Sequence, residues 1–138
     1  MSRDAARSIV APFYDALNQP ATKDVTALVE GAALADWRSY SADGVSKSRD
    51  EFIQQVKGFG KLIPDLTWAI REVLADGDTI VVRSEASGTP AADFFGVPHG
   101  GKSFRIMAID VHKVAGGKLV TAHHVEDWAS AIRQLAAK

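Results

Sequence analysis

Apolar residues in the first sixty positions recur at the three- to four-residue spacing that is typical of helices. One such stripe lies in residues 3–18, a second follows Thr22, and a third occupies residues 48–59. Ser48 and Glu51 stand three apart at the start of the third stripe, which is the pattern of a helix capping box. The first half of the chain therefore predicts three helices.

Beyond Pro64 the apolar positions alternate with polar ones, which is the period of a β-strand. The segments "ADGD" and "AGG" separate these runs in pairs and predict two hairpins. Helices followed by paired strands indicate an α+β fold, with the helices packed on one face of a curved antiparallel sheet. The predicted strands cover 66–74, 79–87, 104–114 and 118–126, and a closing helix covers 128–138.

The second hairpin allows a specific register to be predicted. A two-residue turn at Ala115-Gly116 would place Arg105 opposite Glu126, two unlike charges that favour this pairing. In that register His123, Asp127 and Asp110 share the polar face that would line a pocket. The opposite face would carry His124 and Glu126 among the apolar residues Met107, Ile109, Val111, Val120 and Ala122. The helices suffice to cover one face only, so we expect a second subunit on the other.

Composition narrows the class of protein. The chain has 138 residues with 46% hydrophobic and 24% charged positions, which is typical of one globular domain spanning 1–138. A net charge of −1 without a basic run argues against nucleic-acid binding, and no apolar run approaches the roughly 20 residues of a membrane span. There is no cysteine and no secretion signal, so a cytoplasmic protein is expected.

The segment "AHHVEDW" collects the strongest candidates for chemistry. Neighbouring residues of a strand point to opposite faces, so His123 and His124 cannot bind one ion, and we expect no metal site. Asp127 has two interpretations. Within an apolar pocket its burial would make it a general base, whereas directly before a helix it would serve as an N-cap.

Several motifs resemble one known family. The stretch "SGTPAADFFGVPHGGKSF", the turn "GGKLV", the ending "DWASAIRQL" and the strand start "IPDLTW" resemble SnoaL-like polyketide cyclases, members of the NTF2-like superfamily. This resemblance implies a cone whose interior holds a hydrophobic small molecule, with neither metal nor organic cofactor. It also implies that Asp127 is the acid/base aspartate. The cyclases carry a pocket histidine on the preceding strand, where this chain has Asp110.

Three functions follow as hypotheses. The first is a cofactor-independent cyclase or isomerase in which Asp127 transfers the proton and His123 assists. The second is a small-molecule-binding protein without chemistry, and the third is epoxide hydrolysis by Asp110, Asp127 and an arginine. We expect a homodimer through the outer sheet face and no nucleic-acid or membrane partner. The predicted ligand-binding residues are Tyr14, Trp37, Phe52, Phe59, Trp68, Phe104 and Asp110.

Overall fold

Helices form where the apolar stripes predicted them. The computed structural model describes residues 1–137, so Lys138, the last residue of the predicted closing helix, lies outside the described residues. The capping box is confirmed, because the Ser48 hydroxyl accepts from the Glu51 amide and the Glu51 carboxylate accepts from the Ser48 amide. The helices are α1 (Arg3–Asp15), the short 3-10 helix η1 (Pro20–Thr22), α2 (Val25–Ala32), α3 (Arg49–Leu62) and α4 (Trp128–Ala136).

The sheet has six strands rather than the four predicted. The two additional strands come from the segment between α2 and α3, and β1 pairs parallel to β6, so the sheet is mixed rather than antiparallel. The α+β class is confirmed. In the order β2-β1-β6-β5-β4-β3, the strands are β1 (Ala33–Ala42), β2 (Val45–Ser48), β3 (Thr67–Asp76), β4 (Thr79–Gly88), β5 (Phe104–Ala115) and β6 (Lys118–Glu126).

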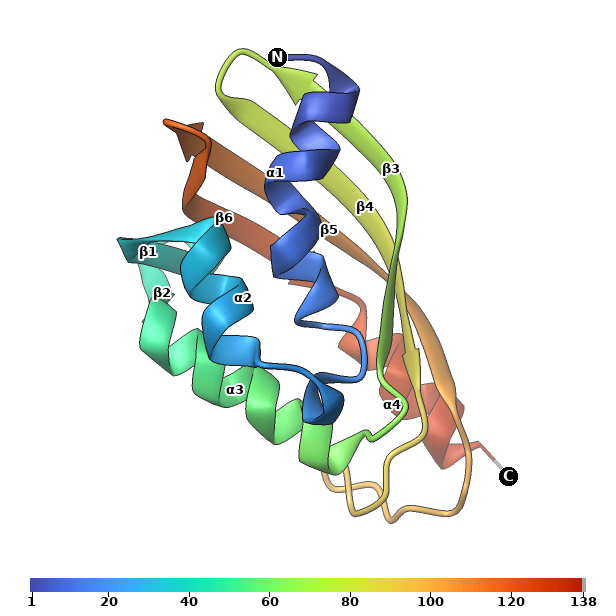
Figure 1. Ribbon diagram of the computed structural model, residues 1–138. Helices are drawn as coiled ribbons and strands as arrows, with labels where there is room; N and C mark the ends of the chain where they lie inside the picture. Colours follow the sequence, from blue (N-terminus) through green and yellow to red (C-terminus); the bar gives the residue numbers. More distant parts are fainter. Residues whose placement is uncertain (138) are drawn as a thin grey trace.

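The sheet curves around the helices on one side only. Helices α1, α2 and α3 lie on its concave face, and α4 lies at the end where β5 begins (Figure 1). Along β4 the residues alternate between buried and half-buried, because every second side chain enters the core between sheet and helices. The opposite, convex face of the sheet is not covered by any described element of this chain.

The β5–β6 hairpin contradicts the predicted register. Its turn is Gly116-Gly117, where both residues have positive φ (57° and 77°), and not Ala115-Gly116. Further along, Val120 is an extra residue in β6, because the paired positions step from Leu119 to Thr121 while β5 advances by one. This bulge exchanges the two faces of β6 for every residue beyond it.

The exchange reverses the predicted environments of the polar residues. Asp110 pairs with His124, and Glu126 lies opposite Ala108 instead of Arg105. His124 and Glu126 therefore face the interior with Asp110, and His123 faces outward. The predicted Arg105–Glu126 pair is wrong, since Arg105 lies 3.7 Å from a carboxylate oxygen of Glu85 instead.

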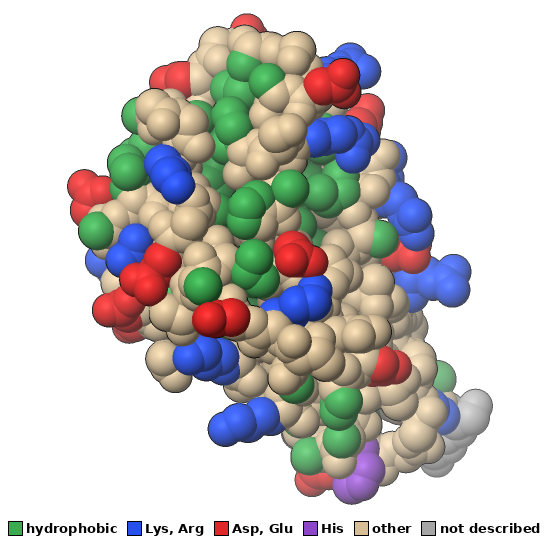
Figure 2. Space-filling model, in the orientation of Figure 1, with side chains coloured by type: hydrophobic (Ala, Val, Ile, Leu, Met, Phe, Trp, Pro, Cys, Tyr) green, Lys and Arg blue, Asp and Glu red, His purple; other side chains and the backbone are tan. Residues whose placement is uncertain are grey.

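Charged side chains of both signs are interspersed over the helical side of the molecule. Figure 2 shows basic and acidic groups alternating there, with hydrophobic patches between them and no extended field of one sign. This distribution agrees with the net charge of −1. Among the described residues, no helix is both long and apolar enough to cross a bilayer.

Candidate active site

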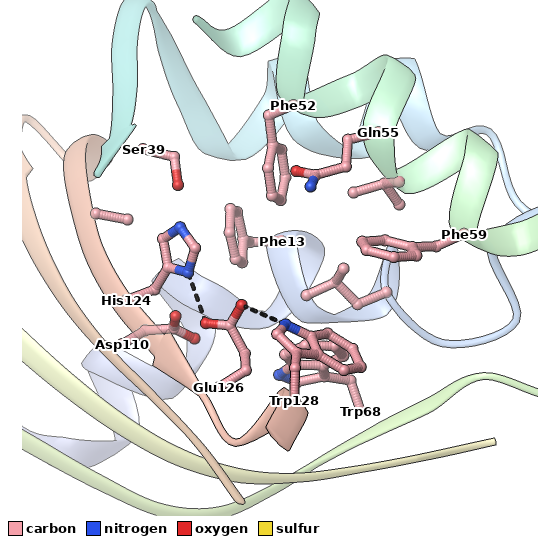
Figure 3. Close-up of a pocket in the computed structure, with 13 residues that line it drawn as sticks. Phe13, Ser39, Phe52, Gln55, Phe59, Trp68, Asp110, His124, Glu126 and Trp128 are labelled. Atoms are coloured by element: carbon pink, nitrogen blue, oxygen red, sulfur yellow. Dashed lines mark hydrogen bonds and ion pairs between the residues drawn. The ribbon is translucent and has the colours of Figure 1, made fainter. Parts of the chain in front are cut away.

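A small cavity lies between the helices and the concave face of the sheet. Its volume is about 60 Å³, and its walls come from α1, α3, α4 and four strands (Figure 3). Aromatic and aliphatic side chains make most of the lining, with a few polar groups on the β5–β6 side, a composition typical of ligand sites. The lining residues are Phe13, Leu17, Ser39, Phe52, Gln55, Val56, Phe59, Trp68, Asp110, Ala122, His124, Glu126 and Trp128.

Three ionisable side chains converge at one end of this cavity. Asp110 from β5 and His124 and Glu126 from β6 each contribute one N or O atom to a group in which these three atoms lie within 4.8 Å of one another. His124 Nδ1 lies 2.5 Å from Glu126 Oε2, and the Trp128 indole N–H donates to Glu126 Oε1 at 3.3 Å. The second ring nitrogen of His124 points toward Ser39 (Figure 3). The pairing fixes the imidazole in place and leaves one nitrogen for a ligand.

Asp110 also accepts a hydrogen bond from a buried tyrosine that does not line the cavity. The Tyr14 hydroxyl donates to Asp110 Oδ2 at 2.5 Å and lies 2.8 Å from His112 Nε2. Tyr14, His112 and Asp110 are all buried, with exposed fractions of 2%, 0% and 6%. The carboxyl group is therefore fixed between a buried hydroxyl and the cavity.

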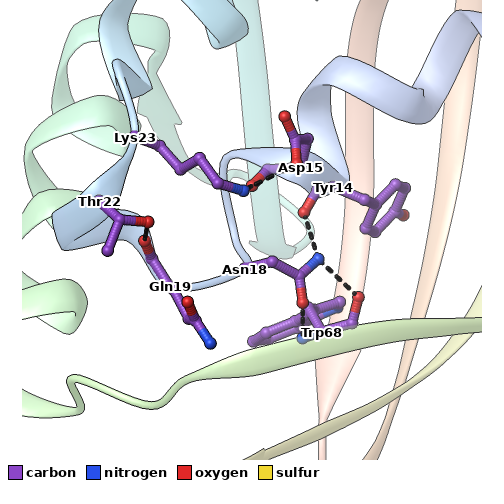
Figure 4. Close-up of polar contacts among 7 residues, drawn as sticks. All are labelled: Tyr14, Asp15, Asn18, Gln19, Thr22, Lys23 and Trp68. Carbon is purple, nitrogen blue, oxygen red and sulfur yellow. Dashed lines mark hydrogen bonds and ion pairs between the residues drawn. The ribbon is translucent and has the colours of Figure 1, made fainter.

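Contacts at the end of α1 position Tyr14. Asn18 donates to the carbonyl oxygens of Tyr14 and Trp68 and accepts from the Trp68 amide at 2.8 Å (Figure 4). Its side chain thus occupies the edge of β3 in place of a further strand. Lys23 binds Asp15 at 2.8 Å on the outer side of the same turn. These bonds anchor the helix end that carries Phe13 and Tyr14 into the site.

The surroundings change the acidity of the cluster. Burial raises the pKa of Asp110 to about 7, although the hydrogen bond from Tyr14 acts in the opposite direction. The hydrogen bond to Glu126 raises the pKa of His124 above its usual 6.5 and outweighs the opposing effect of burial. At neutral pH the carboxyl group is thus poised between its two forms, beside an imidazole whose charged form Glu126 favours. Perturbed acidity of this kind in a cavity is typical of proton-transfer sites.

The two residues predicted to be catalytic do not lie in this cavity. Asp127 is exposed and is the N-cap of α4, where its carboxylate accepts from the Ser130 amide at 3.1 Å and hydroxyl at 2.6 Å. These bonds lower its pKa, the opposite of what a general base requires. His123 is exposed on the outer face and stacks on Tyr40 with ring centroids 4.7 Å apart. The two residues therefore do not share the cavity between helices and sheet that the predicted register gave them.

Of the predicted ligand-binding residues, four line the cavity and three do not. Phe52, Phe59, Trp68 and Asp110 contribute to its walls. Trp37 is fully buried behind Phe13 and Phe52, where it supports the wall without forming it. The two others also lie outside the lining: Tyr14 reaches the site through Asp110, and Phe104 packs against Phe94 and Trp128.

Sequence reasoning missed His124, Glu126, His112 and Trp128 as members or neighbours of the site. The consecutive glycines 116 and 117 were a usable signal, because two positive φ angles favour a glycine pair as the hairpin turn. Placing the turn at Gly116-Gly117 instead of Ala115-Gly116 shifts the pairing of β5 and β6 by two residues, which leaves each side chain of β6 on its predicted face. The bulge at Val120 has no such signature, so the residues of the site could not be assigned from the pattern.

Two other chemistries fit the same geometry less well. Asp110, His124 and Glu126 are close enough to surround a cation, but His124 and Glu126 already satisfy one another through a 2.5 Å contact. No arginine is among the residues lining the cavity; Arg71 and Arg83 form ion pairs with glutamates on β4 and β3. The Asp–Arg–Asp set expected for epoxide hydrolysis is therefore not assembled in the described cavity.

The family model of the SnoaL-like polyketide cyclases matches residues 8–135 of this chain. The chain belongs to this family. The match runs from within α1 to within the last turn of α4 and thus includes every residue that lines the cavity. No curated protein matches the sequence.

Solved structures share the fold over almost the whole length. TsrD from Streptomyces laurentii superposes with a TM-score of 0.84 at 20% identity, covering 100% of this chain and 99% of TsrD. IdmH from Streptomyces antibioticus, described as a candidate polyketide cyclase, gives 0.81 at 22% identity, covering 94% and 97%. AclR from Streptomyces galilaeus, described as a candidate hydroxylase, gives 0.83 at 20% identity, covering 99% of each. These similarities confirm the fold of helices packed on a curved sheet.

Proposed function

We propose that this SnoaL-like protein is a cofactor-independent enzyme that transfers protons on a hydrophobic carbonyl substrate, leading to aldol ring closure or isomerisation. The observation that carries the proposal is the convergence of Asp110, His124 and Glu126 at one end of an otherwise apolar cavity. A buried carboxyl whose pKa is raised to about 7, next to an imidazole whose pKa a carboxylate raises above its usual value, is suited to general acid–base catalysis.

In the proposed reaction, the Asp110 carboxylate takes a proton from the carbon next to the substrate carbonyl. The electron pair of the broken C–H bond forms an enolate, and the His124 imidazolium stabilises its oxygen by donating a hydrogen bond. In a cyclisation, the enolate carbon attacks a second carbonyl of the same molecule and forms the new C–C bond. The resulting alkoxide takes the proton from Asp110, which restores the carboxylate. Glu126 keeps His124 charged and oriented throughout.

The family resemblance supports this assignment, except that the aspartate and the histidine have changed places between the two strands. It implied an aspartate on the last strand and a histidine on the preceding strand, and in this chain the histidine (His124) is on the last strand. Asp110 is on the preceding strand and is its cross-strand partner. The same two chemical groups are thus present with their strands exchanged. A carboxyl and an imidazole can share one substrate from either arrangement, because the two positions face the same cavity.

Exchange of carbon-bound hydrogen for deuterium tests the chemistry without knowledge of the physiological substrate. A panel of hydrophobic cyclic β-diketones and aryl ketones is incubated with the protein in D₂O, and NMR follows the loss of signal next to the carbonyl. We expect the D110N and H124Q variants to lose about 100-fold or more of the rate on any accepted ketone. D127N and H123Q are matched controls outside the cavity and are expected to retain it.

The outcomes separate the proposal from its alternative. Binding of panel members without any enzyme-dependent exchange would favour a small-molecule-binding protein and refute the acid–base role. Full activity in D110N would place the base elsewhere. A loss in D127N equal to that in D110N would favour the role that the family resemblance implied for Asp127.

The convex sheet face is proposed to bind a second copy of the chain. Val125 and Met107 are 64% and 52% exposed there, and a shallow hollow beside them is lined by Tyr40, Ile109 and residues near them. Exposed apolar side chains gathered on one face are typical of subunit interfaces. Of the apolar set predicted for this face, Met107 is exposed, whereas Ala122 lines the cavity.

A further inference from the structure

Two buried groups that the proposed reaction does not use, Tyr14 and His112, form a directed chain of hydrogen bonds. With Asp110 ionised, the Tyr14 hydroxyl donates to Asp110 Oδ2, 2.5 Å away, so the tyrosine oxygen can only accept from its other neighbour. That neighbour is His112 Nε2 at 2.8 Å, which must therefore carry a proton. The chain of donors runs from His112 through Tyr14 to Asp110.

The charge state of His112 agrees with this direction. Burial lowers the pKa of His112 to about 3, so the ring is neutral at physiological pH and holds one N–H. With that proton on Nε2, Nδ1 is a bare acceptor, and it has no hydrogen-bond partner among the described residues. The one ring nitrogen of His112 that has a hydrogen-bond partner is therefore the one directed at Tyr14.

We propose that Tyr14 and His112 are positioning residues that hold Asp110 by Oδ2 and thereby reserve Oδ1 as the oxygen that meets the substrate. No described residue donates to Oδ1, and Asp110 lines the cavity. The inference rests on the proposed function for its catalytic meaning, but the arrangement itself can be measured without substrate. It names two residues outside the cavity lining as determinants of the reaction.

Geometry explains why both members are needed. A tyrosine hydroxyl can rotate about its C–O bond, and with a single partner it would be free to donate elsewhere. The N–H of His112 occupies its acceptor site and directs the remaining proton at Asp110. The groups that face Asp110 are Tyr14 from α1, His112 from its own strand, and His124 and Glu126 from β6. Among these, Tyr14 is the donor at the shortest distance.

Titration of Asp110 by ¹³C NMR of its side-chain carboxyl tests the proposal on the whole, unliganded protein. In Tyr14→Phe the ionised carboxylate loses its donor, so the pKa of Asp110 is expected to rise from about 7 to about 8 or above. Tyr40→Phe is the matched control, because the chain has two tyrosines and the Tyr40 ring stacks on His123 at the outer face. The control is expected to leave the titration unchanged.

Variants of His112 provide the second readout. His112→Leu is expected to raise the pKa of Asp110, and His112→Gln, which retains an N–H donor, is expected to return it toward the wild-type value. The ¹⁵N shifts of wild-type His112 should show a protonated Nε2 and a bare Nδ1. If Tyr14→Phe proves poorly folded by circular dichroism, the proposal is tested by the two His112 variants and by this ¹⁵N measurement.

Two results would overturn the proposal: an unchanged Asp110 titration in folded Tyr14→Phe, or a His112 ring protonated on Nδ1. Failure of the proposed function has a different signature. There the titrations would follow expectation while the deuterium-exchange assay found no activity. If exchange is found, the pH at which its rate is half-maximal should move upward in Tyr14→Phe together with the pKa of Asp110.

Discussion

Replacing Asp110 by asparagine should change how stability depends on pH, and the structure fixes the sign. Burial raises the pKa of this carboxyl from 3.8 to about 7, so between these pH values the folded state holds a proton that the unfolded state has lost. Each pH unit in that interval lowers the free energy of unfolding by about 1.4 kcal/mol. From pH 5 to pH 8 the wild type therefore loses about 3 kcal/mol through this group. The asparagine side chain of the variant does not ionise, so the variant loses none of it.

The assay is urea unfolding of both proteins at pH 5 and pH 8. Asparagine keeps an oxygen that can accept from Tyr14, so the variant should retain the hydrogen bond seen at 2.5 Å. We expect its stability relative to the wild type to increase by about 3 kcal/mol between the two pH values. Asp76→Asn, an exposed aspartate at the end of β3, is the matched control and should show no such change. Equal differences at both pH values for Asp110→Asn would refute the reasoning.

Three further predictions concern the site, the core and the outer face. Glu126→Gln should lower the pKa of His124 in an NMR titration, because the carboxylate that favours the imidazolium is gone, and an unchanged titration would contradict the pairing. In the wild type this pair stabilises the fold at low pH, and the stabilisation is lost as pH rises through the raised pKa of His124; in the variant it should be smaller. Gly88→Ala should destabilise the fold by about 1–3 kcal/mol in urea unfolding, since the added carbon would overlap Ile63 Cγ2; wild-type stability would show that the approach is looser than observed. Val125→Arg should convert a sedimenting dimer into a monomer without loss of fold, and a wild type that sediments as a monomer would exclude the proposed interface.

The periodic part of the fold was predictable from local pattern. Helices α1, α2, α3 and α4 follow apolar stripes, and the start of α3 follows from Ser48 and Glu51. Strands β3, β4, β5 and β6 follow from alternation after Pro64. Strands β1 and β2 were missed, because β1 pairs with β6, about eighty residues further along the chain, and β2 has only four residues. Pairing between distant segments leaves little trace in either segment alone.

The identity of the site depended on one residue that the pattern does not mark. From the chain alone it follows that His123 and His124 lie on opposite faces, that Asp110 lies one strand away, and that a carboxylate precedes the last helix. Which of the two faces is inside follows only from the packed fold. The bulge at Val120 turns His124 inward and His123 outward, and the start of α4 makes Asp127 a cap. A strand's side-chain period is two, so a single inserted residue exchanges every position beyond it, and only the packed sheet determines where that residue is accommodated.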